Sequence, residues 1–324
     1  MTDISPDSSP NFFEGVPQPH PVETTSPEAV ATAEQFIAAE EPQLFQSFSM
    51  PEPQPIVRIP NFGHTLIFGL IASVAAACSG LLTKLALSRH LFGVYTAKQA
   101  STEIHYALGS EAILYLLMLA GCLIIFPIVW QKPFFTGLQW NFATAMRLRW
   151  KLAAAAFSCF LFALLSQALI PGPTNAPIDN IFQSSAAAWM LFAFGITFAP
   201  FFEEMAFRGF LLPAVCTAFD WFLERDANRP ALPLGENNHP QWSMPAMVTG
   251  AIVVSIPFAL LHAEQTGWSI GPFCLLVAVS LVLCAVRLRT RSQAASTLMH
   301  AMYNFLLFST MLLGTDGFRH LDKM

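Results

Sequence analysis

Charged residues are scarce in this chain of 324 residues, because Asp, Glu, Lys and Arg together make up 11% of it, whereas soluble domains carry roughly a quarter. Hydrophobic residues make up 54%, and the mean hydropathy is +0.50. These values exclude a water-soluble globular domain and predict a membrane protein. Basic residues do not gather with aromatic residues in any segment, so the sequence also excludes nucleic-acid binding.

Closely spaced cysteine pairs are absent as well. No CxxC pair occurs, and every cysteine falls inside an apolar stretch, where it behaves as a small hydrophobic residue. The sequence therefore predicts neither disulfides nor cysteine zinc ligands. The six residues concerned are Cys78, Cys122, Cys159, Cys216, Cys274 and Cys284.

Residues 1–60 lack the basic segment and the apolar segment of a signal peptide. They hold 11 of the 24 prolines and nine of the 21 acidic residues, and Arg58 is their one basic residue. This composition predicts a disordered, acidic, proline-rich tail. The formal net charge of −5 is therefore a property of the tail and not of the remainder.

Apolar runs long enough to cross a bilayer follow from residue 62 onward, since a crossing needs about 20 helical residues. We expect spans near 62–82, 112–130, 152–170, 186–222, 246–262, 270–286 and 294–313. As one helix the fourth run would be about 55 Å long, against about 30 Å of hydrocarbon, so it is predicted to break, at Pro200. The predicted fold class is all-α: a polytopic transmembrane bundle of about seven to eight helices behind a disordered tail.

The orientation is predicted from the basic residues that flank the spans. If the fourth run makes one net crossing, ten Lys and Arg lie on the side of the tail and five on the other side. If it crosses twice, the two sides are nearly balanced. Because cytoplasmic loops carry an excess of Lys and Arg, we expect one net crossing and a cytoplasmic N-terminus.

Ionisable side chains inside apolar runs are costly and mark candidate functional sites. Glu203 and Glu204 directly follow Pro200-Phe201-Phe202. Arg208 stands four residues after Glu204, on the same helix face, so the two are predicted to form a buried ion pair. Glu203 lies about 100° around the helix and is left free for chemistry.

The remaining candidates lie on two other predicted helices. His262 ends one apolar run, and His300 and Asn304 project together from one face of another. A carboxylate and an imidazole that meet at one water molecule can remove its proton, and a second His with an Asn can donate hydrogen bonds to a developing oxyanion. These residues are the parts of a hydrolase.

Three strings carry a resemblance to a known family. They are Glu203-Glu204-Met205-Ala206-Phe207-Arg208-Gly209 (EExxxRG), Phe258-Ala259-Leu260-Leu261-His262 (FxxxH) and His300-Ala301-Met302-Tyr303-Asn304 (HxxxN). In this order and spacing they resemble the motifs of the CAAX-prenyl-protease and bacteriocin-processing (CPBP, Abi) family of intramembrane endopeptidases. The segment Arg289-Thr290-Arg291-Ser292 resembles that family too, and the resemblance covers about residues 186–310.

The resemblance implies a role for each motif residue. Glu203 and His262 would activate water, while His300 and Asn304 would form the oxyanion hole. Glu204 and Arg208 would hold the first motif in shape, and Phe258 would pack beside His262.

The resemblance also implies a helical membrane bundle whose site lies within the bilayer and is reached from the cytoplasmic side. The eukaryotic members of the family that the chain resembles remove the tail of prenylated CAAX proteins. For this chain it implies a multi-pass membrane protein whose partners are the lipid bilayer and a peptide or protein substrate at the membrane. The expected divisions are the tail 1–60, N-terminal transmembrane helices 61–185, a CPBP-like protease core 186–313 and a short tail 314–324.

Several alternatives stay open at this stage. A catalytically silent membrane scaffold or bacteriocin-immunity factor of the same fold would need no chemistry, but all the catalytic positions are occupied. A transporter would show paired broken helices in two halves, and only one break is predicted. A zinc-dependent metalloprotease is the chemical alternative; the HExxH pattern is absent and an amide is a poor zinc ligand, so no cofactor is expected.

Other polar residues are given structural interpretations. His64, His90 and His105 lie in or near predicted loops, and we expect them at the headgroups without a partner. Glu264, two residues after His262, is expected to be a solvated loop charge.

Overall fold

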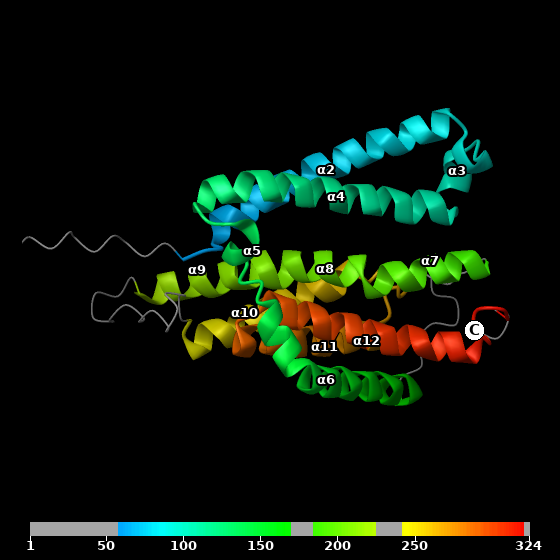
Figure 1. Ribbon diagram of the computed structural model, residues 1–324. Helices are drawn as coiled ribbons and strands as arrows, with labels where there is room; N and C mark the ends of the chain where they lie inside the picture. Colours follow the sequence, from blue (N-terminus) through cyan, green and yellow to red (C-terminus); the bar gives the residue numbers. More distant parts are fainter. Residues whose placement is uncertain (1–57, 170–183, 225–241, 321–324) are drawn as a thin grey trace, which may run out of the picture. The chain divides into compact units, whose positions relative to one another are not determined.

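The computed structural model describes residues 58–169, 184–224 and 242–320 (Figure 1). Within these ranges every regular element is a helix and no strand occurs, which confirms the predicted all-α class. The described helices belong to one packed unit. Apart from residues 58–60, the acidic tail lies outside the described residues.

Long helices dominate the described chain, with short ones in the connections. The long ones are α2 (Phe62–Ser88), α4 (Ile104–Trp130), α6 (Phe142–Leu169), α10 (Met244–Leu261), α11 (Ile270–Thr290) and α12 (Gln293–Gly314). One further run comprises α7 (Ser185–Ile196), α8 (Phe198–Glu204), the π-helix η3 (Met205–Leu211) and α9 (Leu212–Glu224). The short ones are η1 (Leu91–Gly93), α3 (Ala97–Ala100) and α5 (Phe134–Gly137).

Six described helical runs are long and apolar enough to cross a membrane: α2, α4, α6, the run from α7 to α9, α10 and α11. This pattern makes the chain an integral membrane protein with several membrane-spanning helices. α12 has a comparable length, but Gln293, His300 and Asn304 interrupt its apolar character. Two of these polar residues, His300 and Asn304, are among those predicted to carry the chemistry.

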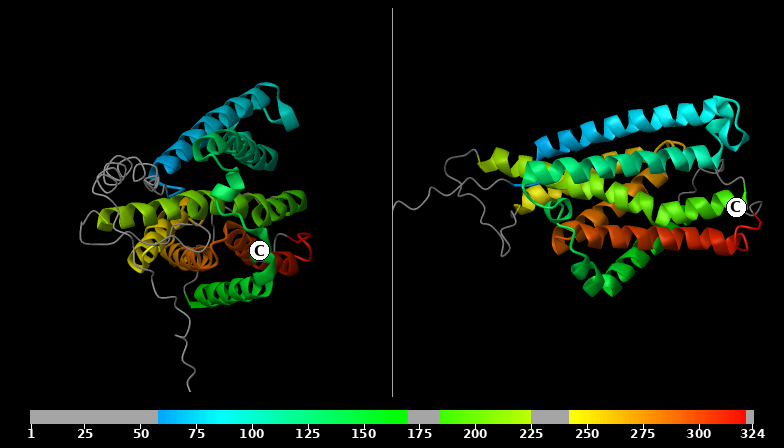
Figure 2. Two further views of the ribbon diagram at one scale, coloured as in Figure 1. Left: turned by 60° about the vertical axis from the view of Figure 1, so that its left-hand side comes forward. Right: turned by 45° about the horizontal axis from the view of Figure 1, so that its top comes forward.

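The break predicted in the fourth run is present, three residues earlier than expected. Thr197 leaves helical geometry, with φ −124° and ψ −75°, and separates α7 from α8. Pro200 explains the position, because it has no N–H and its ring clashes with the carbonyl four residues before it. From α7 to α9 the run continues in one general direction (Figures 1 and 2), as one net crossing requires.

The helix ends form two groups, which we call the Arg58 end and the His262 end. At the Arg58 end, Arg58 Nη2 lies 2.6 Å from Glu224 Oε1, which ties the start of α2 to the end of α9. Asp220 accepts a hydrogen bond of 2.9 Å from the backbone N–H of Ser243, just before α10. The His262 end carries the starts of α4 and α7, the segment 262–269 and the end of α12 (Figure 1).

Backbone contacts at the Arg58 end also fix where α12 begins. The Ser292 hydroxyl donates to the carbonyl of Asn141 at 2.8 Å, and the N–H of Gln293 donates to the carbonyl of Gln139 at 3.0 Å. Arg287, buried on α11, donates to the carbonyl of Leu138 at 3.4 Å. Because α12 starts from this anchored turn, the position of its side chains two and three turns later is set as well.

Two of the three histidines predicted to lack a partner have a polar one. His64 is buried at the start of α2, where its Nδ1 accepts the N–H of Asn61 at 3.0 Å and its ring lies edge-on to Trp130. His105 Nδ1 lies 2.6 Å from Glu103 Oε1. The prediction was wrong for both, because His64 completes a capping box and His105 lies in the first turn of α4. All six cysteines are free, as predicted.

Candidate active site

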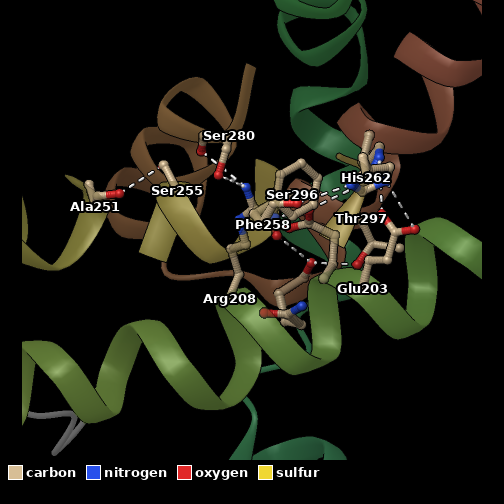
Figure 3. A network of polar contacts seen from close by, with 12 residues as sticks. Glu203, Arg208, Ala251, Ser255, Phe258, His262, Ser280, Ser296 and Thr297 are labelled. Carbon is tan, nitrogen blue, oxygen red and sulfur yellow. Dashed lines mark hydrogen bonds and ion pairs between the residues drawn. The ribbon is translucent and has the colours of Figure 1, made fainter. Parts of the chain in front are cut away.

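The Glu203 carboxylate lies between two imidazole rings that come from different parts of the chain. Its Oε1 is 3.7 Å from Nε2 of His262, and its Oε2 is 3.7 Å from Nε2 of His300. Glu203 is near the end of α8, His262 follows the last residue of α10, and His300 is on α12. The structure therefore brings together three residues that the sequence places on three separate helical segments. Glu203 and His262 are labelled in Figure 3.

Hydrogen bonding fixes which nitrogen of His262 carries a proton. Its Nδ1 lies 3.0 Å from the carbonyl oxygen of Phe258, which can only accept, so Nδ1 is the donor. In the neutral ring Nε2 is then unprotonated and faces Glu203. The Phe258 ring packs beside His262, at 5.1 Å between ring centroids, where the FxxxH spacing places it.

Glu204 and Arg208 form the predicted ion pair, at 2.9 Å, and neither side chain is exposed. Arg208 also donates to the hydroxyl of Ser280 at 2.6 Å, and its guanidinium lies 4.3 Å from the ring centre of Phe258 (Figure 3). These contacts join η3, α11 and α10 behind the site. Arg208 has no access to the cavity, which favours a structural role.

Loss of Arg208 is expected to destabilise the fold. Arg208→Ala strands the buried Glu204 carboxylate, so the free energy of unfolding should fall by roughly 3 to 5 kcal/mol. Thermal unfolding in detergent measures the change, with Arg289→Ala, an exposed arginine on α11, as the matched control. If Arg208→Ala unfolds at the temperature of the parent, the ion pair does not stabilise the bundle.

A π-helix follows Glu204 directly, over Met205–Leu211. Such wide turns are rare and occur frequently at functional sites. Gly209 lies within it, and a Cβ there would come within 3.2 Å of the Leu138 side chain. The glycine of the EExxxRG string therefore allows the segment before α6 to pack closely on η3.

His300 is held from both sides of its ring. Its Nδ1 lies 3.1 Å from Glu204 Oε1, which accepts, so this nitrogen carries a proton. To donate a hydrogen bond from Nε2 as well, the ring must be an imidazolium. A role in an oxyanion hole therefore requires the doubly protonated ring between Glu203 and Glu204.

Asn304 lies one turn further along α12 and uses one amide hydrogen within the fold. Its Nδ2 donates to the carbonyl of Gly195, near the end of α7, at 2.8 Å. A Cβ at Gly195 would come within 2.6 Å of the Phe308 ring, so any larger residue would require this ring to shift. The second amide hydrogen of Asn304 remains available on a side chain whose orientation is fixed.

All four predicted catalytic residues line one cavity of about 300 Å³. Its other walls are mainly apolar and come from α4, α7, α11 and α12. Two further polar residues, Gln265 and Thr266, line the cavity from the segment after α10, at the His262 end. Glu264 is exposed, as predicted for a solvated charge.

One ionisable residue of this cavity was missed by the sequence analysis. Glu111 lines the cavity from α4, and the Tyr115 hydroxyl donates to its Oε1 at 2.8 Å. The expected span begins near residue 112, whereas α4 begins at Ile104, so Glu111 lay outside the expected span. The i and i+4 spacing of Glu111 and Tyr115, in register with the apolar Ile104 and Leu108, was the signal that could have identified it.

Zinc is the metal that the resemblance leaves open. Among the residues that the structure describes, no group of three or more His, Cys, Asp or Glu side chains is arranged to hold a metal ion. Of the four cavity residues, Asn304 offers an amide that already donates to Gly195, and an amide is a poor zinc ligand. No step below is derived through a metal.

The fold and the cluster define a class: a multi-pass helical membrane protein with an ionisable Glu/His site among its helices. Residues 183–306 match the family model described as type II CAAX prenyl endopeptidase Rce1-like, which confirms the resemblance. All four predicted catalytic residues lie in the matched segment, whereas Glu111 lies outside it. No curated protein and no solved structure matches the chain.

Proposed function

We propose that this chain is an intramembrane endopeptidase that hydrolyses peptide bonds of membrane-associated substrates. The observation that carries the proposal is the position of Glu203, whose two carboxylate oxygens each face the Nε2 atom of a different histidine at 3.7 Å. This arrangement lies in a largely apolar cavity and within the segment that matches the protease family.

Each step of the proposed reaction uses a group of this chain. Glu203, assisted by Nε2 of His262, removes a proton from a water molecule, and the oxygen attacks the peptide carbonyl carbon. The oxyanion receives hydrogen bonds from the second amide hydrogen of Asn304 and from the His300 imidazolium. The C–N bond then breaks, and the proton held by Glu203 passes to the leaving nitrogen, which gives a carboxyl group and an amine.

The substrate is proposed to be a peptide or protein in or at the membrane. CAAX-type prenylated proteins are one candidate class, because the matching family is described by that activity. The cavity supports an aliphatic or aromatic substrate, since its lining includes Leu191, Phe194, Leu276, Leu307 and Phe308.

Comparison of membrane proteomes tests the proposal in cells. Strains that express the parent or Glu203→Gln at equal levels should differ in peptides that end at new cleavage sites. If the two strains yield the same termini, the chain has no proteolytic activity there, and the alternative of a silent scaffold or immunity factor replaces the proposal.

Orientation in the membrane is the second part of the proposal. Arg58 lies at the Arg58 end, whereas Gln265 and Thr266 belong to the segment that follows the far end of α10. With one crossing per long helix, the two ends face opposite sides of the membrane. We propose a cytoplasmic N-terminus, as the basic residues predict, which places the cavity rim on the opposite side of the membrane. Access from the cytoplasm, which the family resemblance implies, requires the reverse orientation.

Sided cysteine labelling is expected to separate the two ends. With Cys78 and Cys274 replaced by Ser, a membrane-impermeant maleimide should label Ala143→Cys, at the Arg58 end, from one side and Glu264→Cys from the other. We expect Ala143→Cys to be labelled from the cytoplasm. Labelling of both positions from the same side would contradict the single-crossing arrangement.

A further inference from the structure

Glu111 is an ionisable cavity residue to which the proposed reaction assigns no role. It lies on α4, is half-buried, and lines the same cavity as Glu203 and His262. Tyr115, which donates to its Oε1 at 2.8 Å, is stacked on Phe202 at 4.4 Å between ring centroids. Since Phe202 directly precedes Glu203, α4 is packed against the catalytic segment through this tyrosine.

The two oxygens of Glu111 have different surroundings. Oε1 is engaged by Tyr115, whereas Oε2 has no hydrogen-bond partner among the described residues. Oε2 is not one of the buried side-chain atoms that lack a partner, so it remains accessible. One carboxylate oxygen is therefore fixed in orientation while the other stays open to a ligand in the cavity.

Glu111 forms no ion pair with any of the described residues that line this cavity. Its described lining contains the carboxylates of Glu111 and Glu203 and the rings of His262 and His300, but no Lys or Arg. Arg208, which lies behind the site, is fully buried and is neutralised by Glu204. The His300 imidazolium lies between Glu203 and Glu204, so a substrate in the cavity meets the Glu111 carboxylate without an adjacent Lys or Arg side chain.

A charge inside a membrane protein is stabilised mainly by a partner of opposite sign. We infer that Glu111 determines substrate specificity: it selects peptides with a Lys or Arg side chain beside the cleaved bond and disfavours peptides that place a carboxylate in the cavity. The inference rests on the proposed function and adds a substrate class to it. Because α4 lies outside the matched segment, the preference is a property of this chain and not of the three motifs.

The test compares cleavage of three membrane-anchored peptides that carry Lys, Gln or Glu next to a cleavage site mapped with the parent protein. We expect the parent to favour Lys over Glu by about tenfold or more in kcat/KM, since like charges brought together oppose binding. Glu111→Gln should bring this ratio close to one, mainly through a higher KM for the Lys peptide. Glu111→Lys should reverse the ratio, and Glu111→Asp should restore the preference of the parent.

Controls separate recognition from structure and from catalysis. Glu264→Gln removes an exposed carboxylate near the site and should leave the ratio unchanged, and Tyr115→Phe should keep the sign of the preference. An active Glu111→Gln with the ratio of the parent would overturn the inference while leaving the proposed function intact. If the parent cleaves none of the peptides, or if Glu203→Gln cleaves them equally well, the proposed function fails instead.

Discussion

Turnover by Glu203→Gln is expected to fall by about 100- to 10,000-fold, the range that a positioned general base contributes. An amide keeps the shape of the side chain but cannot accept the proton of the attacking water. It also leaves Nε2 of His262 without the carboxylate that faces it at 3.7 Å. Initial rates on a membrane-anchored peptide measure the loss.

The matched control is Glu264→Gln, which removes a carboxylate two residues after His262 that is exposed to solvent. It should turn over the peptide at the rate of the parent. Thermal unfolding should show that Glu203→Gln is folded. A folded Glu203→Gln with undiminished turnover would remove Glu203 from the role of general base.

Asn304→Asp is expected to reduce the rate by about 100- to 1000-fold, the usual effect of losing one oxyanion-hole donor. A carboxylate at this position would face the developing oxyanion and would also face the carbonyl of Gly195, to which the amide now donates at 2.8 Å. KM should change little if the interaction is made in the transition state. Steady-state rates, together with an unfolding curve, distinguish the catalytic effect from a loss of the Gly195 contact.

The same variant distinguishes the two chemical mechanisms. Carboxylate is a better zinc ligand than amide, so a zinc enzyme would keep its metal and much of its activity in Asn304→Asp. Metal content by mass spectrometry is measured on the same preparation. An active, zinc-loaded Asn304→Asp protein would contradict the metal-free mechanism proposed above.

Most of the helical bundle could be predicted from hydropathy, because an apolar run in a membrane has few structural alternatives to a helix. The ends of the helices were predicted less well. α4 begins eight residues before the expected span and α6 ten residues before it, since their first turns carry polar residues that hydropathy assigns to loops. This error concealed Glu111, which lies in the second turn of α4.

The site was predictable where helix periodicity governs it. The spacing of Glu204 and Arg208 predicted their ion pair, and the structure places Arg208 Nη1 2.9 Å from Glu204 Oε1. The approach of Glu203 to His262 and His300 depends on how α8, α10 and α12 pack, which spacing alone does not determine. The family resemblance, and not the spacing, predicted that these three residues belong to one site.

Contacts with backbone carbonyls could not be predicted at all. Asn304 binds the carbonyl of Gly195, and Nδ1 of His262 binds that of Phe258. Such partners have no side-chain identity in the sequence, yet they decide which hydrogen each residue has left for chemistry. The π-helix after Glu204 and the break at Thr197 are likewise backbone features that the residue pattern indicated only in part.

Hydrolysis by the purified protein in liposomes, in water enriched in ¹⁸O, tests the central claim most directly. The account predicts that the parent, with far less than one metal ion per chain, cleaves a membrane-anchored peptide and places one ¹⁸O atom in the new carboxyl group. Glu203→Gln, reconstituted in parallel, should release product at least about 100-fold more slowly. Equal cleavage by the parent and Glu203→Gln, or cleavage by the parent only when zinc is bound, would contradict it.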